Sequence, residues 1–402
     1  MADLQHALPV AGIRLGVAAA GIRYRNRDDL VLIELAEGSV AAAVFTRNAF
    51  FAAPVEVARA HLAAAAPRAL LINSGNANAG TGTAGLDAAR YTCQLVAEAL
   101  DCEPEAVLPF STGVIGEQLP VARFREGVPT AAANLCLDGW ERAARAIMTT
   151  DTRPKIASRA LSVGGRAATV TGMAKGAGMI CPDMATLLAF VTTDARVEPQ
   201  PLQAMLAQGV ERSFNRITVD GDTSTNDACL LVATGLAGNR AVTDLAADGG
   251  AILAEAVAEV CDELAEAVVR DGEGATKFIR IRVSGGRSGE ECRRVAYTVA
   301  HSPLVKTAFY ASDANWGRIL AAVGRSGLED LQLDRVDILL DHVRVVRRGG
   351  RDPDYQEAQG SAVMLQPEIT VSIALGRGSA ETEIRTCDLS HDYVSINANY
   401  RS

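Results

Sequence analysis

Residues 171–193, TGMAKGAGMICPDMATLLAFVTT, join two segments of opposite character. The first, residues 174–184, contains Gly176 and Gly178, which permit unusual backbone angles, and Pro182, which stiffens the chain. The second, residues 186–193 (TLLAFVTT), is a short and strongly apolar run of the kind that forms a fully buried strand. The sequence therefore predicts a glycine-rich turn that leads directly into a buried strand.

The elements around this stretch alternate between strands and helices without a regular strand–helix–strand period. Two strands, residues 155–162 and 166–173, precede it. Further upstream, the apolar runs 30–36 and 40–46 are separated only by Glu37-Gly38-Ser39, which is typical of a hairpin. Helices are expected at residues 83–100, 201–214 and 251–270. This mixture predicts an α+β fold, or a mixed α/β fold with largely antiparallel sheets.

Composition excludes several classes of protein. The chain has 402 residues, 49% of them apolar, which suffices for two or three domains with a large core. A net charge of −9 argues against a nucleic-acid partner. No apolar segment reaches the roughly 18 residues of a membrane span, and the N-terminus lacks a signal-peptide pattern, so we expect a cytoplasmic protein. The cysteines and histidines are scattered, so we expect no metal site.

The first residue of the buried strand, Thr186, can be a nucleophile. Attack of its hydroxyl on the adjacent backbone carbonyl would cut the chain between Ala185 and Thr186. Cleavage frees an α-amine with a reference pKa of about 7.7–8.0, which can accept the hydroxyl proton near neutral pH. One residue would then supply both nucleophile and base. On the residues alone, the alternative is that Thr186 is simply a β-favouring residue and Lys175 a solvated loop lysine.

The same stretch resembles the cleavage-site motif of the ornithine acetyltransferase family. The matching residues are Lys175, Gly176, Gly178, Met179, Ile180, Pro182, Met184, Ala185 and Thr186. Cys181 and Asp183 depart from the alanine and asparagine of the family pattern, and Asp183 adds charge next to the cut. The resemblance continues in order along most of the chain, at residues 72–78, 111–116, 219–227, 313–318 and 395–400.

The resemblance implies a layered architecture and a processed chain. It implies a helix–sheet–sheet–helix core with largely antiparallel sheets and a smaller C-terminal α/β domain. Self-cleavage would produce an N-terminal chain, residues 1–185, and a C-terminal chain, residues 186–402, that share one core. Two copies of each chain would assemble into a tetramer.

It also implies a role for particular residues. Thr186 would be the nucleophile, and Thr112 and Gly113 would stabilise the oxyanion of the tetrahedral intermediate. The residues implied to contact substrate are Thr149, Lys175, Thr186, Glu273, Asn397 and Ser402. Lys175 suits an α-carboxylate. Glu273 suits either the side-chain ammonium of acetylornithine or the amine that is acetylated, and both roles stay open. Ser402 replaces a threonine common in the family and keeps its hydroxyl.

The expected reaction moves acetyl from N2-acetylornithine to glutamate through an acetyl-threonine enzyme, which recycles acetyl groups in arginine biosynthesis. No cofactor is expected. Many members of the family also accept acetyl-CoA as a co-substrate, and the sequence does not decide between one activity and two. Two alternatives are a related self-cleaving aminopeptidase or amidohydrolase with water as acceptor, and a non-catalytic binding protein of the same fold.

Overall fold

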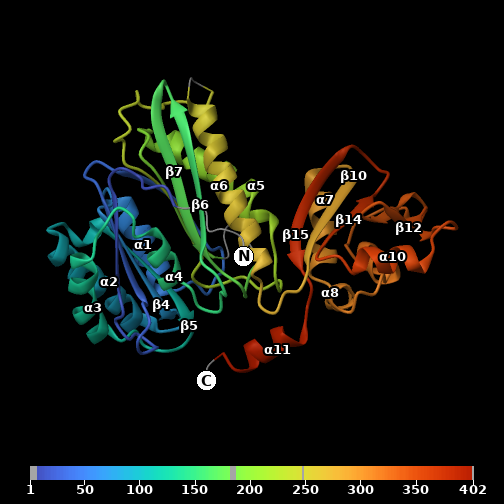
Figure 1. Ribbon diagram of the computed structural model, residues 1–402, viewed down its shortest axis with the longest axis horizontal. Coiled ribbons are helices and arrows are strands. Elements are labelled where there is room, and N and C mark those ends of the chain that lie inside the picture. Colours follow the sequence, from blue (N-terminus) through green and yellow to red (C-terminus); the bar gives the residue numbers. More distant parts are fainter. Residues whose placement is uncertain (1–6, 182–186, 247–248, 401–402) are drawn as a thin grey trace. The chain divides into compact units, whose positions relative to one another are not determined.

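The computed structural model describes residues 7–181, 187–246 and 249–400. The chain forms two compact units, the first comprising Met1–Asn215 with Asp222–Val268 and the second Arg216–Gly221 with Val269–Ser402. Both combine helices with mixed sheets (Figure 1). This confirms the predicted α+β class and the smaller C-terminal α/β domain.

The first unit contains two sheets. The four-stranded sheet has the order β1-β2-β4-β5, with β1 at Ile13–Ala18, β2 at Leu30–Leu35, β4 at Ala69–Asn76 and β5 at Val107–Val114. The five-stranded sheet has the order β3-β9-β8-β7-β6, with β3 at Val40–Phe45, β9 at Ala228–Ala233, β8 at Leu188–Thr193, β7 at Arg166–Lys175 and β6 at Lys155–Val163. Only the pairs β4–β5 and β8–β9 are parallel among these ladders, as the expectation of largely antiparallel sheets requires.

The predicted hairpin at residues 30–46 is wrong. Both strands form, but β2 pairs with β1 and β4, whereas β3 pairs with β9. The short link at residues 37–39 therefore carries the chain from one sheet to the other. Two apolar runs and a glycine turn indicate strands, but they do not say whether the strands bond to each other or face each other across a core.

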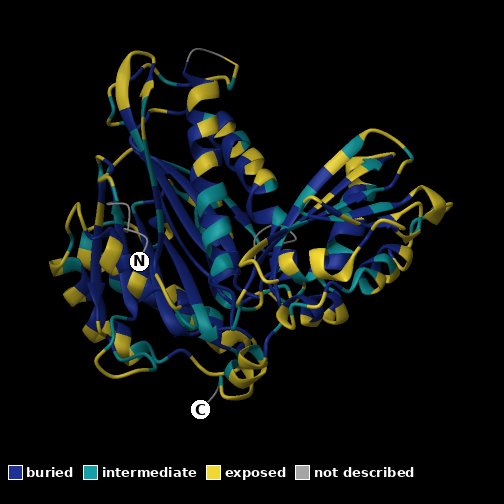
Figure 2. Cartoon of the chain, turned by 45° about the vertical axis from the view of Figure 1, so that its right-hand side comes forward, coloured by how far each residue is buried: buried dark blue, intermediate teal, exposed yellow. Residues whose placement is uncertain are grey.

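Apolar side chains fill the space between the two sheets. Ile33, Ile72 and Phe110 of the four-stranded sheet pack in one cluster with Phe190 and Leu230 of the five-stranded sheet. The strands β4, β8 and β9 are buried along their whole length, whereas the helices carry exposed residues on one side (Figure 2). The strand β8, Leu188–Thr193, is buried along its whole length, as predicted for the strand at residues 186–193, the first of which lies outside the described residues.

Helices cover the outer faces of both sheets. The helices α2 (Gly82–Leu100) and α3 (Val121–Ala133) pack on the four-stranded sheet, and α5 (Pro199–Arg212) and α6 (Gly250–Arg270) pack on the five-stranded sheet. Two further helices, α1 (Ala53–Ala64) and α4 (Trp140–Ala146), lie beside β5 and β1 respectively. The first unit is thus the expected helix–sheet–sheet–helix core.

The expected cleavage position falls between two neighbouring strands. β7 ends at Lys175, β8 begins at Leu188, and these two residues are paired in an antiparallel ladder. Ala185 and Thr186 themselves lie outside the described residues. The five-stranded sheet draws β3, β6 and β7 from before residue 185 and β8 and β9 from after it. Chains of residues 1–185 and 186–402 would therefore remain joined by backbone hydrogen bonds within one sheet.

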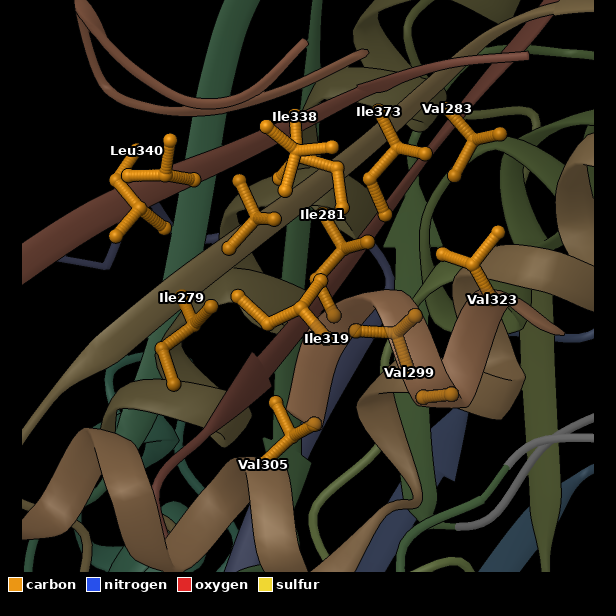
Figure 3. Packing of buried hydrophobic residues seen from close by; sticks show 14 of the residues in the cluster. Ile279, Ile281, Val283, Val299, Val305, Ile319, Val323, Ile338, Leu340 and Ile373 are labelled. Carbon is orange, nitrogen blue, oxygen red and sulfur yellow. The ribbon is translucent and has the colours of Figure 1, made fainter. Parts of the chain in front are cut away.

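The second unit is a six-stranded sheet with helices. Its order is β13-β12-β11-β14-β10-β15, with β10 at Phe278–Gly286, β11 at Asp337–Leu340, β12 at Val343–Arg347, β13 at Gly350–Arg351, β14 at Glu368–Ala374 and β15 at Ala380–Cys387. The helices are α7 (Gly289–Ala300), α8 (Pro303–Tyr310), α9 (Trp316–Gly324), α10 (Glu357–Met364) and α11 (His391–Ala398). Figure 3 shows Ile281 and Ile373 of the sheet in one core with Val299 and Ile319 of the helices.

Candidate active site

The expected oxyanion residues lie where two parallel strands approach unusually closely. Gly113 of β5 is paired with Gly75 of β4, and Thr112 is paired with Ser74. Gly113 has a φ of +136°, and a Cβ atom there would lie 2.2 Å from the carbonyl carbon of Gly75. Any larger residue would push the strands apart. The glycine expected at this position is therefore required by the backbone itself.

Lys175, the last residue of β7, brings three of the expected residues together. Its Nζ donates hydrogen bonds to the Thr149 Oγ1 at 2.8 Å and to the Thr112 Oγ1 at 3.3 Å. The lysine is buried, with 9% of its surface exposed. An ammonium group can only donate, so both hydroxyl oxygens accept here. Their hydroxyl hydrogens are consequently available to acceptors other than Lys175.

A buried ion pair that the sequence did not reveal lies beside this group. The Asp151 Oδ1 accepts from the Lys155 Nζ at 2.6 Å and from the Gly176 backbone N–H at 2.7 Å. The Asp151 Oδ2 accepts from the Thr149 N–H at 3.0 Å. Burial alone would raise the pKa of the Asp151 carboxyl, but the charges of Lys155 and Lys175 and these hydrogen bonds outweigh it. They hold the pKa well below its ordinary value, so Asp151 is ionised.

Asn226 ties three family-like segments together around the site. Its Nδ2 donates to the carbonyl oxygen of Ala77 at 2.6 Å and to that of Ser111 at 2.9 Å. The Ser111 hydroxyl in turn donates to the Asn73 Oδ1 at 2.6 Å. Because buried amides and hydroxyls need partners, this network holds the segment after β4 against β5. The segments at residues 72–78 and 111–116 thus meet residues 222–227 in the first unit.

Asp227 presents a buried carboxyl at the edge of this network. It is 2% exposed, and its Oδ2 has no hydrogen-bond partner within the described part of the chain. Burial raises the pKa of Asp227 well above its ordinary value, while a Ser224 hydrogen bond and the charge of Lys175 act more weakly in the opposite direction. The neighbouring Ala228 N–H donates to the carbonyl of Leu187, at the start of β8, at 3.0 Å. The neutral form of Asp227 is therefore favoured.

Asp227→Asn should make the free energy of unfolding less sensitive to rising pH. A folded-state pKa above the unfolded value of about 3.9 means that the folded protein holds the proton more tightly. Its contribution to stability is complete below the unfolded pKa and is lost as the pH rises through the folded pKa. The loss amounts to at most about 1.4 kcal/mol per pH unit. Asparagine does not titrate, so the variant lacks this loss.

Urea unfolding between pH 4.5 and 8 measures the difference. Asp87→Asn serves as the control, because the Asp87 side chain is 69% exposed and should leave the pH profile of the wild type unchanged. Parallel pH profiles for the wild type and Asp227→Asn would show that Asp227 is already ionised in the folded protein.

Two expected substrate contacts lie together in the second unit. The Asn397 Nδ2, on α11, donates to the Glu273 Oε2 at 2.7 Å. Glu273 is 7% exposed and lies in the turn that follows α6. The end of this turn is fixed by Asp388, whose Oδ1 accepts from the N–H groups of Thr276 and Lys277 at 2.8 and 2.9 Å. The carboxylate of Glu273 is therefore held in place by a side-chain amide.

Three expected site residues, Ala185, Thr186 and Ser402, lie outside the described residues. Within the described ranges, no group of three or more histidine, cysteine, aspartate or glutamate side chains is arranged to hold a metal ion. None of the described helices is both long and apolar enough to cross a membrane.

Sequence reasoning missed Asp151, Lys155 and Asp227. Asp227 could have been singled out, because it ends the family-like segment 219–227 directly before an apolar run. Asp151 and Lys155 carried a weaker signal. Asp151 and Lys155 are four residues apart, a spacing that brings two side chains together on a helix. Here Lys155 begins a strand, so the spacing did not indicate an ion pair.

Comparison with known proteins identifies the family. The chain matches the model of the ArgJ family over residues 14–402. The "Arginine biosynthesis bifunctional protein ArgJ" of Methylococcus capsulatus is 60% identical over 98% of this chain and 96% of that protein. Its namesake in Psychrobacter arcticus is 54% identical over 98% and 97%. A solved ornithine acetyltransferase from Mycobacterium tuberculosis, complexed with ornithine, is 38% identical over 45% of this chain and 98% of that chain, with a TM-score of 0.40. The chain therefore belongs to the ArgJ family.

Proposed function

We propose that this protein transfers acetyl from N2-acetylornithine to glutamate through an acetyl ester on Thr186, as a step of arginine biosynthesis. Membership of the ArgJ family supports the pathway and the reaction class. One structural observation carries the assignment of the site: the buried Lys175 ammonium bonds at once to Thr112, an expected oxyanion residue, and to Thr149, an expected substrate contact.

The chemistry of these groups fits an acylated amino acid. The ammonium of Lys175 and the hydroxyl of Thr149 suit the α-carboxylate of the substrate. The Thr112 hydroxyl and the Gly113 N–H suit the oxygen of the acetyl group, which becomes negatively charged when the carbonyl is attacked. Both kinds of group therefore lie within one hydrogen-bonded cluster, as they must to act on a carboxylate and on an acetyl group in the same small molecule.

The proposed reaction has two balanced halves. The Thr186 oxygen forms a bond to the acetyl carbon and passes its proton to the α-amine of Thr186. The bond between the acetyl carbon and the nitrogen of acetylornithine then breaks, and the α-amine returns the proton to that nitrogen as ornithine leaves. In the second half, the amine of glutamate forms a bond to the acetyl carbon and passes a proton to the α-amine of Thr186. The bond between the acetyl carbon and the Thr186 oxygen then breaks, and the α-amine returns the proton to that oxygen, which releases N-acetylglutamate and restores Thr186.

Intact mass spectrometry after brief exposure to acetylornithine tests the proposal. We expect an acetyl adduct on the chain of residues 186–402 and ornithine release that depends on glutamate. Initial rates against both substrates should give parallel double-reciprocal lines. Equal ornithine release with and without glutamate would instead favour water as the acceptor, as in a self-cleaving aminopeptidase. Intersecting lines without any adduct would contradict the acetyl-enzyme.

The proposal extends to a second donor and to assembly. The relatives are named bifunctional, which supports acetyl-CoA as an additional acetyl donor for glutamate. Release of free thiol from acetyl-CoA, dependent on glutamate, would measure it. We also propose an assembly of two copies of each chain in the cytoplasm, for which light scattering should give twice the mass of the 42.1 kDa chain.

A further inference from the structure

Asp151 and Lys155 form a buried ion pair that the proposed reaction does not use. The side chain of Asp151 is 0% exposed and that of Lys155 is 1% exposed. Desolvation makes such pairs costly, so a buried ion pair is weak evidence of a contribution to stability. The position of this pair beside Lys175 and Thr149 suggests a role in the site.

Asp151 accepts hydrogen bonds from residues in three different segments. One comes from the backbone N–H of Thr149 in the loop after α4, one from the side-chain ammonium of Lys155 at the start of β6, and one from the backbone N–H of Gly176 directly after β7. Lys175 precedes Gly176, and its Nζ returns to the Thr149 hydroxyl. These bonds close a ring through Asp151, Thr149, Lys175 and Gly176. In this ring the Asp151 carboxylate binds the backbone at Thr149 and directly after Lys175, the two residues expected to contact substrate.

The ammonium group of Lys175 suits an anionic ligand. Lys155 bonds directly to Asp151, whereas the Lys175 Nζ donates to the hydroxyls of Thr112 and Thr149. The positive charge of Lys175 also helps to lower the pKa of Asp151. A charge-assisted hydrogen bond from such an ammonium group is a suitable contact for the α-carboxylate of a substrate.

We propose that Asp151, paired with Lys155, is a positioning residue that fixes Thr149 and Lys175 to receive the α-carboxylate of the acetylated amino acid. This inference rests on the proposed function. Asparagine at position 151 would keep one acceptor oxygen, but it could not serve the Thr149 N–H, the Gly176 N–H and the Lys155 ammonium together. The ring would open, and Lys155 would lose its ion pair with Asp151.

The double variant Asp151→Asn with Lys155→Met separates positioning from folding. Removing one member of a buried ion pair is strongly destabilising, whereas replacing both by neutral groups is often tolerated. We expect the double variant to melt close to the wild type and to undergo the same self-cleavage. A second double variant, Glu291→Gln with Arg377→Met, breaks a largely buried pair in the second unit and serves as the matched control.

The decisive measurement compares two donors, N2-acetylornithine and its α-carboxamide, which lacks the carboxylate charge. For the wild type and the control we expect kcat/KM to be about 10- to 100-fold higher for the carboxylate than for the carboxamide. This ratio corresponds to the usual free-energy contribution of hydrogen bonds to a charged group. In the Asp151/Lys155 double variant the preference should fall close to one, as in Lys175→Met. A general structural defect would lower both rates equally and preserve the preference.

The outcomes distinguish the positioning role of Asp151 from the proposed function of the protein. A double variant that cleaves itself and keeps the full preference for the carboxylate overturns the positioning role and leaves the proposed function intact. If the double variant loses the preference and also melts below the wild type, it is compared with the Glu291/Arg377 control under conditions where both proteins are equally stable. The positioning role is supported if the control keeps the preference for the carboxylate, and it is overturned if the control loses this preference as well. A wild type that transfers no acetyl from either donor refutes the proposed function itself.

Discussion

Thr186→Ala should yield one uncut chain of 402 residues with no measurable acetyl transfer. Alanine has no hydroxyl to attack the adjacent carbonyl, so the chain stays whole and no acetyl ester can form. Loss of an active-site nucleophile typically lowers kcat by about 10⁴- to 10⁶-fold. A denaturing gel and the release of ornithine from acetylornithine measure the two effects on the same sample.

Folding of this variant should be almost unchanged, because the ladder between β7 and β8 does not require the chain to be cut. Thr186→Ser is the matched control. Serine keeps the hydroxyl but loses the methyl group that restricts its rotation, so cleavage should persist with slower transfer. N-terminal sequencing of active wild type should detect a chain that starts at Thr186. Detection of Met1 or Ala2 as the sole start in active protein would refute the mechanism.

Thr112→Val should lower kcat by about 10²- to 10³-fold, which is the usual cost of removing one oxyanion donor. The Lys175 ammonium donates to the Thr112 oxygen, so the hydroxyl hydrogen must be directed at another acceptor. Valine has nearly the same shape and favours strands, so β5 should form normally. The steady-state kinetics of ornithine release check the prediction, with the effect expected mainly in kcat.

Thr112→Ser provides the comparison, because it restores the hydroxyl and should recover most of the rate. Equal losses in the valine and serine variants would mean that the methyl group of Thr112, and not its hydroxyl, is what the site requires. A rise in KM without a fall in kcat would assign Thr112 to ground-state binding through Lys175.

Most elements of this fold were predictable from local patterns. The runs that become β4, β6, β7, β8 and β10 are apolar or alternating, and such runs form strands wherever a core exists to bury them. The long helices α2 and α6 carry apolar residues on one face. The partners of the strands were not predictable in this way. β2 and β3 adjoin in sequence yet belong to different sheets, because pairing depends on contacts with distant strands.

The site residues, too, were only partly predictable from the sequence. Thr112, Gly113, Thr149 and Lys175 were expected from motifs spread over the sequence, and the structure brings Lys175 into contact with both threonines. The structure joins Glu273 to Asn397 as well. Their roles in substrate binding stay predictions, as does the cut before Thr186. Asp151 escaped notice because a single aspartate in a polar loop has the same appearance in sequence whether it is solvated or buried.

By itself, the sequence determined the alternation of strands and helices and the resemblance that assigns the chain to a family. Only the tertiary structure decided which strands pair, and which charges are removed from water. Burial changes the behaviour of identical side chains. Asp151, among lysines and N–H donors, is ionised, whereas the neutral form of Asp227 is favoured, because its carboxyl is buried and one of its oxygens has no hydrogen-bond partner among the described residues. That difference arises from desolvation and neighbouring charges, which depend on contacts between residues far apart in the chain.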